Sequence, residues 1–551
     1  MTKPVETVLS IRNLTIDLPS GGDRPHAVSN LSLDIREKEI LCIVGESGSG
    51  KSITSFAAMG LLPKALKPSG GEILFEGRDV LTLSEAEHSG LRGNRMGMIF
   101  QEPMSALNPC YTVGDQIEEV FKAHTSLPRA ERRQRTLALL KEVRLPEPER
   151  LYHAYPHQLS GGQRQRIVIA MALAMEPRLL IADEPTTALD VTTQAQILDM
   201  FKALKESRKA GILFVTHDFD VVAEIADRVV VMQKGVVVEQ GTVDEVLNNP
   251  RHPYTRMLID AVPKRHSGKG KPDGTMPIAL RVAGIEKTYA SARTLFRPAR
   301  KVHAVKSTDF TVLEGQTLGI VGESGSGKTT LVRCLMGLVE PDEGSVWVGN
   351  ARLDTKSATG RRDFRKLIQI VFQDPYGSLN PRRTIGDLLV EGPVNFGVPR
   401  KQAMEKAREL LRLVRLEEDA LERYPAQFSG GQRQRISIAR ALMVEPKILI
   451  ADEAVSALDV SVQKDVLKLL ADIRKSVGLT VVFITHDLRV AAEISDHILV
   501  MSKGEVVEYG TVDDIFGNPR HPYTRQLLAA MPGRGWEAPD MTALAAVDAA
   551  R

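Results

Sequence analysis

The stretch EILCIVGESGSGKS, residues 39–52, is the most informative part of the chain. It begins as a nearly continuous apolar run, which is typical of a strand buried on both faces of a parallel sheet. It ends in the pattern GxxxxGK[ST], in which glycines let backbone N–H groups turn inward around phosphates. The alternative, a flexible Gly-Ser turn, is disfavoured because chance gives the pattern only about 0.02 times in such a chain. Since TLGIVGESGSGKT at 317–329 repeats it, we predict an α/β fold with two phosphate-binding loops.

Four further motifs also occur twice. They are LSGGQRQR at 159–166 and FSGGQRQR at 428–435, LLIADE at 179–184 and ILIADE at 448–453, VTHD at 215–218 and ITHD at 484–487, and NPRHPYTR at 249–256 and 518–525. The copies are offset by 277 residues at the phosphate loop (322 − 45) and by 269 at every later motif (428 − 159). A period this long indicates a duplicated domain rather than a solenoid.

We therefore expect two domains, at residues 1–263 and 278–532. The segment between them, residues 264–277, is rich in Lys, Gly and Pro, which favours a flexible linker over a basic interaction tail. Residues 533–551 are expected to be a disordered tail. Apolar runs that end in polar residues alternate with helical patterns in each domain, so ligands should bind at the carboxyl ends of the strands.

The composition excludes several classes of protein. Among 551 residues, 72 Lys and Arg face 69 Asp and Glu, a formal charge of +3 that argues against a general nucleic-acid binder. Cys42, Cys110 and Cys334 lie too far apart for a disulfide framework or a CxxC metal site, which fits a reducing cytosol. The longest apolar run, residues 167–175, has nine residues and is too short to cross a bilayer. The N-terminus lacks the apolar segment of a secretory signal.

The polar residues of each phosphate loop have expected roles. Lys51 and Lys328 should reach the β- and γ-phosphates, and the hydroxyls of Ser52 and Thr329 should bind Mg²⁺. The helix that follows each loop directs its positive end at the anion.

Adjacent carboxylates end the strands of LLIADE and ILIADE. Neighbours on a strand point in opposite directions. Asp183 and Asp452 could therefore hold Mg²⁺ while Glu184 and Glu453 polarise the attacking water. Taken alone, such a pair is more often a helix N-cap. Its position after a phosphate loop in both copies favours the catalytic interpretation.

Two further motifs leave a structural and a functional interpretation open. His217 and His486 end apolar strands, 33 residues after Glu184 and Glu453. Such a histidine is usually packed or capping, but a neutral imidazole could also hydrogen-bond the γ-phosphate and orient the water. The SGGQ segments at 160–163 and 429–432 open helices, either as ordinary N-caps or as anion-binding N-termini.

The chain resembles the ATP-binding cassette (ABC) ATPase family over nearly its whole length. The phosphate loop resembles its Walker A motif, LSGGQ and FSGGQ its signature, and LLIADE and ILIADE its Walker B with the catalytic Glu. ALD at 188–190 and 457–459 resembles the D-loop, and the histidines match the switch His. The glutamines of IFQEP and VFQDP match the Q-loop. The resemblance implies two tandem P-loop domains, each a mainly parallel sheet with an antiparallel β subdomain and a helical signature subdomain.

The resemblance also implies ATP and Mg²⁺ as cofactors and a set of site residues. The catalytic residues are Glu184, Glu453, His217 and His486. The metal ligands are Ser52, Gln101, Asp183, Thr329, Gln373 and Asp452. The nucleotide-binding residues are Gly45, Ser47, Gly48, Gly50, Lys51, Ser52, Gln101, Ser160, Gly161, Gly162, Gln163, Tyr289, Gly322, Ser324, Gly325, Gly327, Lys328, Thr329, Gln373, Ser429, Gly430, Gly431 and Gln432.

In this family the cassettes pack head to tail, and each ATP lies between the Walker A of one and the signature of the other. Site one would join the first phosphate loop to residues 429–432, and site two the second loop to residues 160–163. Both sites retain every expected catalytic residue, so we expect two hydrolytic sites. Fusing the cassettes raises the effective concentration of each for the other.

Two positions depart from the family pattern. An aromatic residue usually stacks on adenine upstream of Walker A. Tyr289 fits this role in the second copy, but the first has Leu18 there. Because a base–aromatic stack contributes roughly 1–3 kcal/mol, site one should bind ATP more weakly. Ala454 replaces Pro185 after the catalytic Glu and is expected to loosen that turn.

The segments around the Q-loops and NPRHPYTR resemble the oligopeptide/dipeptide/nickel branch of bacterial importers. Fusion of both cassettes resembles the peptide importer subunits of the microcin C type and glutathione importer subunits. The resemblance implies two separate integral membrane permeases, a periplasmic solute-binding protein, no nucleic acid, and a peripheral location at the cytoplasmic face of the inner membrane. Many relatives ligate an iron–sulfur cluster after HPYT. No cysteine follows Cys334 here, so no cluster is expected.

An alternative function is that of a soluble tandem ABC ATPase acting on the ribosome. Such proteins also have two cassettes and no membrane spans, but they carry a long, charged helical linker. The linker expected here has about 14 residues with several Gly and Pro. This difference and the HPYT segments favour the importer. Within importers, peptide, glutathione and nickel remain open as the solute.

Overall fold

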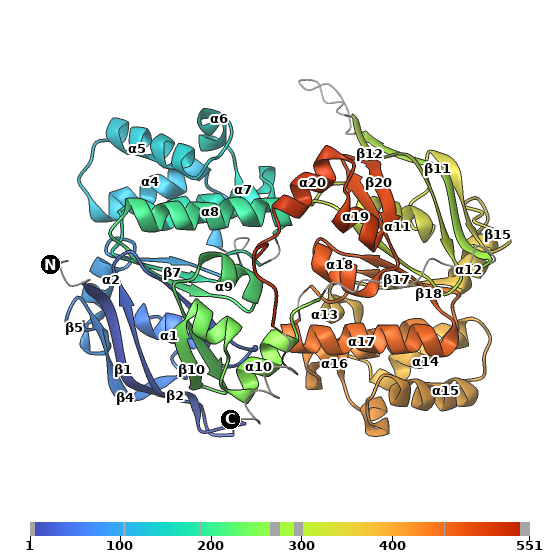
Figure 1. The fold of residues 1–551 in the computed structure, drawn as a ribbon, viewed down its shortest axis with the longest axis horizontal. Helices are drawn as coiled ribbons and strands as arrows, with labels where there is room; N and C mark the ends of the chain where they lie inside the picture. Colours follow the sequence, from blue (N-terminus) through green and yellow to red (C-terminus); the bar gives the residue numbers. More distant parts are fainter. Residues whose placement is uncertain are drawn as a thin grey trace. The chain divides into compact units, whose positions relative to one another are not determined.

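The structure is a computed structural model that describes residues 6–21, 23–102, 106–187, 189–264, 276–290, 301–456, 458–539 and 541. The chain divides into two compact units (Figure 1). Unit 1 comprises residues 1–189, 193–262 and 532–551, and unit 2 comprises residues 190–192 and 263–531. Most of the expected linker, residues 265–275, lies outside the described residues.

A six-stranded sheet forms the centre of unit 1, in the order β10-β9-β3-β8-β7-β6. All its neighbouring strands are parallel except β9 and β10. Every residue of β3, β7 and β8 is buried, as the apolar runs predicted. The strands are β3 (Ile40–Val44), β6 (Met96–Ile99), β7 (Leu179–Asp183), β8 (Gly211–Val215), β9 (Arg228–Gln233) and β10 (Val236–Thr242).

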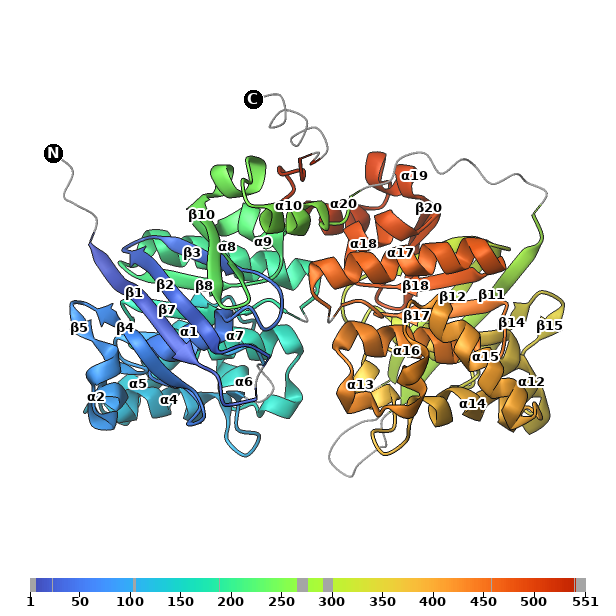
Figure 2. The ribbon, with the colours of Figure 1, turned by 90° about the horizontal axis from the view of Figure 1, so that it is seen from below.

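An antiparallel sheet in the order β2-β1-β4-β5 and a set of helices complete unit 1 (Figure 2). Its strands are β1 (Thr7–Asp17), β2 (His26–Arg36), β4 (Lys67–Phe75) and β5 (Arg78–Asp79). The helices are α1 (Lys51–Ala58), α2 (Glu85–Leu91), α4 (Val113–His124), α5 (Arg129–Glu142), α6 (Pro148–Tyr152), α7 (Gly161–Leu173), α8 (Val191–Ser207), α9 (Phe219–Ile225) and α10 (Pro253–Asp260). Helices α4 to α7 pack on one another and form the helical subdomain.

Unit 2 repeats this arrangement. Its main sheet has the order β16-β17-β18-β13-β19-β20 and its antiparallel sheet the order β12-β11-β14-β15. The strands are β11 (Ile278–Ala290), β12 (Lys301–Leu313), β13 (Thr317–Val321), β14 (Glu343–Val348), β15 (Ala351–Arg352), β16 (Ile368–Val371), β17 (Ile448–Asp452), β18 (Thr480–Ile484), β19 (His497–Ser502) and β20 (Glu505–Thr511). The predicted fold class, two α/β P-loop cassettes, is confirmed.

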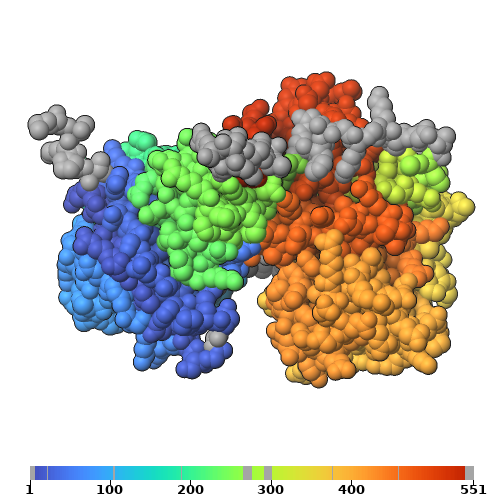
Figure 3. Space-filling model, turned by 60° about the horizontal axis from the view of Figure 1, so that its bottom comes forward, coloured from blue at the N-terminus to red at the C-terminus, as the bar shows by residue number. Residues whose placement is uncertain are grey.

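The helices of unit 2 follow the same plan. They are α11 (Lys328–Leu335), α12 (Ala358–Leu367), α13 (Pro375–Ser378), α14 (Ile385–Asn395), α15 (Arg400–Leu413), α16 (Gly430–Leu442), α17 (Val460–Val477), α18 (Leu488–Ile494), α19 (Val512–Gly517) and α20 (Pro522–Ala529). Helices α14 to α16 form the helical subdomain, much of which is coloured orange in Figure 3. Within the described ranges, no helix is both long and apolar enough to cross a bilayer.

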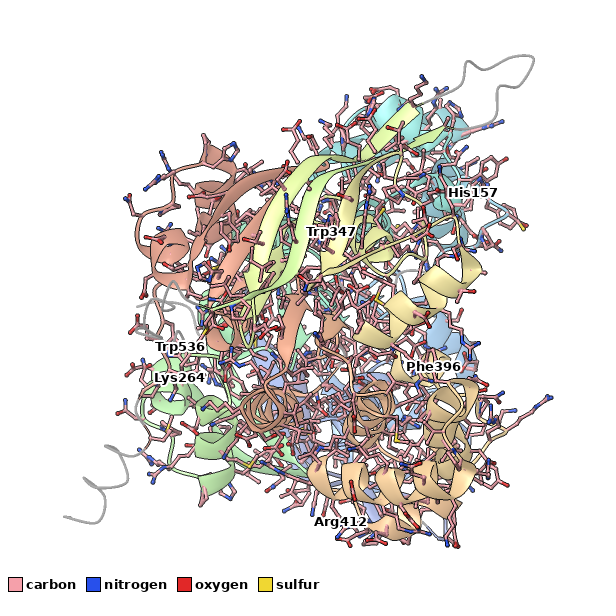
Figure 4. All side chains as sticks on the ribbon, turned by 90° about the vertical axis from the view of Figure 1, so that its right-hand side faces the viewer. His157, Lys264, Trp347, Phe396, Arg412 and Trp536 are labelled. Carbon is pink, nitrogen blue, oxygen red and sulfur yellow. The ribbon has the colours of Figure 1, made fainter. Side chains whose placement is uncertain are left out.

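The first residues of the C-terminal tail pack on unit 1. The backbone N–H of Gly533 donates to Glu224 Oε2 at 3.2 Å, and the Trp536 indole N–H donates to Asn248 Oδ1 at 2.9 Å (Trp536 is labelled in Figure 4). The Trp536 ring also contacts the apolar core of unit 1. This part of the tail is thus held by specific contacts, which differs from the disorder expected for 533–551. Residue 540 and residues 542–551 lie outside the described part of the chain.

Candidate functional site

The phosphate loop of unit 1 joins β3 to α1. Gly45 and Gly50 have φ values of 149° and 103°, and a Cβ on Gly45 would lie 2.2 Å from the Met232 carbonyl oxygen, so only glycine fits there. The buried Lys51 ammonium donates to the carbonyls of Gly45 (2.7 Å) and Glu46 (2.9 Å). The loop therefore holds a lysine at the start of a helix, where the helix dipole also favours an anion.

The strand β7 brings the predicted carboxylates to this loop. Ser52 Oγ donates to Asp183 Oδ1 at 3.1 Å, which places a hydroxyl beside a carboxylate, the two oxygen donors expected of a Mg²⁺ site. Burial raises the pKa of the Asp183 carboxyl to about 6, against the opposing effects of Ser52 and Lys51. A cation bound to Asp183 would offset the cost of burying its charge.

Glu184 lies at the centre of a second group of contacts. Its backbone has a φ of 47°, in the left-handed region, which turns the chain directly after the strand. Its carboxylate accepts hydrogen bonds from Gln101 Nε2 (3.0 Å) and Thr187 Oγ1 (3.1 Å), and His217 Nδ1 lies 3.4 Å away. Burial opposes ionisation of Glu184, but the His217 hydrogen bond and charge outweigh it and lower the pKa to about 2. The carboxylate is thus ionised at neutral pH.

The phosphate loop and carboxylates of unit 2 have nearly the same geometry. Lys328 Nζ donates to the carbonyls of Gly322 (2.6 Å) and Glu323 (2.9 Å). Burial lowers the pKa of Lys328 and raises that of Asp452. Thr329, by contrast with the half-buried Ser52, is exposed.

Glu453 is held in the same way as Glu184. Gln373 Nε2 donates to its Oε2 at 2.8 Å, and His486 Nδ1 lies 3.5 Å from that oxygen. The His486 hydrogen bond lowers the pKa of Glu453 despite burial. Burial opposes protonation of His486, but Glu453 raises its pKa overall. The backbone φ is again 47°, so the exchange of Pro185 for Ala454 leaves the backbone at the glutamate unchanged.

The SGGQ segments lie at the N-termini of other helices. Ser160 caps α7, since its Oγ accepts a hydrogen bond from the Gln163 backbone N–H. In turn, the Ser160 backbone N–H donates to Gln163 Oε1 at 3.0 Å, which completes a capping box. Ser429 and Gln432 form the same capping box on α16. Helix α7 packs on α4, α5 and β6. The SGGQ segment at its start therefore belongs to the helical subdomain and not to the phosphate loop of the same unit. Residues 188 and 457 of the D-loops lie outside the described residues.

Strand register supports the comparison of Leu18 with Tyr289. Asp17 pairs with His26 in unit 1, and Thr288 pairs with His303 in unit 2. Leu18, directly after β1, and Tyr289, within β11, therefore occupy equivalent positions. Tyr289 is 42% exposed, with Lys287 Nζ 5.9 Å from its ring centre, so its ring is accessible for stacking.

The structure also assigns a contact that the sequence did not reveal, to the tyrosine of NPRHPYTR. The Glu46 backbone N–H donates to Tyr254 Oη at 3.2 Å, and the Tyr254 hydroxyl donates to Glu46 Oε2 at 3.1 Å. In unit 2 the Glu323 N–H donates to Tyr523 Oη at 3.1 Å. Burial raises the pKa of Tyr523 to about 12, so it remains protonated. Each phosphate loop is thus tied to the helix that begins within HPYT, α10 in unit 1 and α20 in unit 2.

Known families match both halves of the chain. The family described as ABC transporter matches residues 28–187 and 305–456, and the one described as oligopeptide/dipeptide transporter, C-terminal region, matches residues 238–293 and 507–544. The chain belongs to the ABC transporter family and is an ABC transporter ATPase subunit. Within that family it is of the oligopeptide/dipeptide transporter type, and the HPYT tyrosines lie in its characteristic region.

Several curated proteins are similar over most of the chain. The glutathione import ATP-binding protein GsiA of Escherichia coli O157:H7 is 46% identical over 563 residues, covering 95% of this chain and 89% of that protein. The GsiA proteins of Escherichia coli strain K12 and of Shigella flexneri match with the same identity and coverage. Among solved structures, cbiO1 from Clostridium perfringens is 27% identical, with a TM-score of 0.39, and covers 46% of this chain and 94% of its own.

Proposed function

We propose that this chain is the ATP-hydrolysing subunit of a bacterial ABC importer for short peptides, with the tripeptide glutathione as the first candidate solute. The observation that supports this most directly is the repeated group of loop lysine, paired carboxylates, glutamine and histidine, on a chain whose two halves both carry the oligopeptide/dipeptide region. The glutathione importer names of its relatives support the choice of solute. The oligopeptide/dipeptide region favours an importer over a ribosome-acting ATPase.

In the proposed mechanism the loop lysines, Lys51 and Lys328, leave the carbonyls that they contact and bind the β- and γ-phosphates of ATP. The glutamates, Glu184 and Glu453, polarise the attacking water, since each is ionised and fixed by hydrogen bonds. His217 and His486 keep these carboxylates ionised and oriented.

Mg²⁺ fits beside each phosphate loop. The residues that would hold it are Ser52, Gln101 and Asp183 in the first cassette and Thr329, Gln373 and Asp452 in the second. Bound there with the phosphates, the ion would neutralise part of their negative charge.

We further propose that the signature residues of the opposite cassette complete each ATP-binding site. These are residues 429–432 for site one and 160–163 for site two. The positive end of the helix dipole at the start of α7 and of α16 suits a triphosphate. Closure on ATP and reopening after hydrolysis would then drive two separate integral membrane permeases, supplied with solute by a periplasmic binding protein. The chain would act at the cytoplasmic face of the inner membrane.

The test is purification of the full chain from solubilised membranes, with identification of the integral proteins that accompany it. Two permeases are expected, and ATP hydrolysis by the reconstituted complex should rise with glutathione or a dipeptide and with a solute-binding protein. Recovery with ribosomes, and with no permease, would contradict the proposal.

A further inference from the structure

Unit 2 contains a strongly basic pocket away from its phosphate loop. The pocket has a volume of about 390 Å³ and lies between α12 and the end of α14. Arg361, Arg362 and Arg365 line one side, and Asn395 and Phe396 line the other (Phe396 is labelled in Figure 4). No carboxylate lines it among the described residues. Three guanidinium groups therefore share a concave site with no carboxylate in its lining; the Asp354 carboxylate lies beside the first turn of α12.

The three arginines are held in place by neutral groups. Arg361 donates to the Thr355 carbonyl, Arg362 to the Asn395 carbonyl, and Arg365 to the Gly337 carbonyl at 2.9 Å. Each of these partners is a backbone carbonyl, which carries no net charge. A carbonyl fixes a guanidinium without cancelling its charge, so the pocket is preorganised and remains positive.

Further positive charge lies beside the pocket. Lys366 Nζ is 4.8 Å from the centre of the Phe396 ring, and the Arg362 guanidinium is 5.4 Å from the same ring centre. The acidic residue of α12, Asp363, is exposed and does not line the pocket. The Phe396 ring thus attracts two cations beside the pocket.

Unit 1 shows that the shared fold does not require this charge. Ser84 caps α2 and Ser357 caps α12, so these helices are equivalent. Arg92 donates to the Gly60 carbonyl in unit 1 as Arg365 donates to the Gly337 carbonyl in unit 2. Both pairs are offset by 273 residues (357 − 84 and 365 − 92). At this offset His88 and Ser89 occupy the positions of Arg361 and Arg362. Burial lowers the pKa of His88, so this histidine is neutral at pH 7.

We propose that the pocket between α12 and α14 binds a phosphate-bearing anion, either free in solution or as the headgroup of an anionic lipid. Guanidinium groups bind phosphate through two parallel N–H bonds, and each arginine here has N–H groups beyond those bonded to carbonyls. The volume lies in the range of small-ligand sites. The N-terminal turn of α12 at Ala358 also lines the pocket and adds the positive end of a helix dipole.

The experiment uses the full chain saturated with a non-hydrolysable ATP analogue, so that the phosphate loops are occupied. Two probes are compared: inorganic pyrophosphate in a calorimetric titration, and vesicles of phosphatidylglycerol and phosphatidylcholine in a flotation assay. The test variant is Arg361→His with Arg362→Ser, which introduces the residues that unit 1 tolerates. The control is Arg408→Ser with Arg412→Ser, which removes the same charge from exposed positions of α15.

We expect the wild type to bind one of the probes. Its affinity for that probe should fall by more than about tenfold in the test variant and stay unchanged in the control. Binding of pyrophosphate would identify the natural ligand as a free phosphate compound. Binding to vesicles alone would identify it as a lipid headgroup. The proposal is overturned if the wild type binds neither probe, if both variants lose binding equally, or if only an acidic peptide such as poly-glutamate binds and responds to the test variant.

Discussion

Replacing the HPYT tyrosines by phenylalanine tests whether they position the phosphate loops. Tyr523→Phe keeps the partly buried ring and removes the oxygen that accepts from the Glu323 N–H at 3.1 Å. Tyr254→Phe removes two hydrogen bonds, from the Glu46 N–H at 3.2 Å and to the Glu46 carboxylate at 3.1 Å. Neither change alters a residue proposed to touch the nucleotide.

The expected loss follows from the number of hydrogen bonds. One such bond contributes about 0.5–1.5 kcal/mol net, so Tyr523→Phe should weaken ATP binding at its site by about 2- to 12-fold. Two bonds give about 1–3 kcal/mol, or about 5- to 150-fold, for Tyr254→Phe. These values assume that the loop reaches its nucleotide-binding shape only when its second residue is held.

The assay is titration of the full chain with a fluorescent ATP analogue in the presence of Mg²⁺. Tyr509→Phe is the control, because the Tyr509 hydroxyl makes only a long 3.4 Å contact with the Thr311 carbonyl, away from the loop. If both HPYT variants fold normally and bind nucleotide as tightly as wild type, the tyrosines do not position the loops and this reasoning is wrong.

Four other outcomes are expected. Glu184→Gln and Glu453→Gln should each reduce ATP turnover with binding retained, and together by about 100-fold or more, measured by phosphate release; wild-type turnover in the double variant would exclude their role as bases. Leu18→Tyr should tighten nucleotide binding at site one by about 1–3 kcal/mol, supplying the ring that Tyr289 supplies in unit 2, and an unchanged titration would contradict this. Trp536→Ala should destabilise unit 1 by about 1–3 kcal/mol in urea unfolding, because the indole loses its apolar contacts and its bond to Asn248. Purified protein should contain no iron–sulfur cluster, so stoichiometric iron with visible absorbance would refute the inference from cysteine positions.

The sequence predicted the fold and the main members of each site because these follow from local patterns. A buried strand, a glycine loop and a helix start are consecutive in the chain, so residue order alone brings Lys51 to the end of β3. Adjacent residues at the end of a strand diverge, which separates Asp183 from Glu184. Gln101 contacts Glu184 across 83 residues, and only the family resemblance assigned Gln101 to the site.

Other features have no local signal. Tyr254 meets Glu46 across 208 residues, and neither the tyrosine nor its neighbours carry a pattern that points to the phosphate loop. The three arginines of α12 belong to no motif identified in the sequence. Only the end of α14, folded against them, completes the pocket.

The duplication, the two P-loop cassettes and the residues proposed to carry ATP chemistry could be predicted from the sequence, since these depend on spacing, apolar periodicity and glycine geometry within short segments. Only the folded structure shows that the HPYT tyrosines contact the phosphate loops, that Trp536 packs on the core of unit 1, and that unit 2 has a basic pocket of which two arginines have no counterpart in unit 1. These contacts join residues from distant segments, and the free energy of such contacts depends on how helices and sheets pack rather than on the order of neighbouring residues.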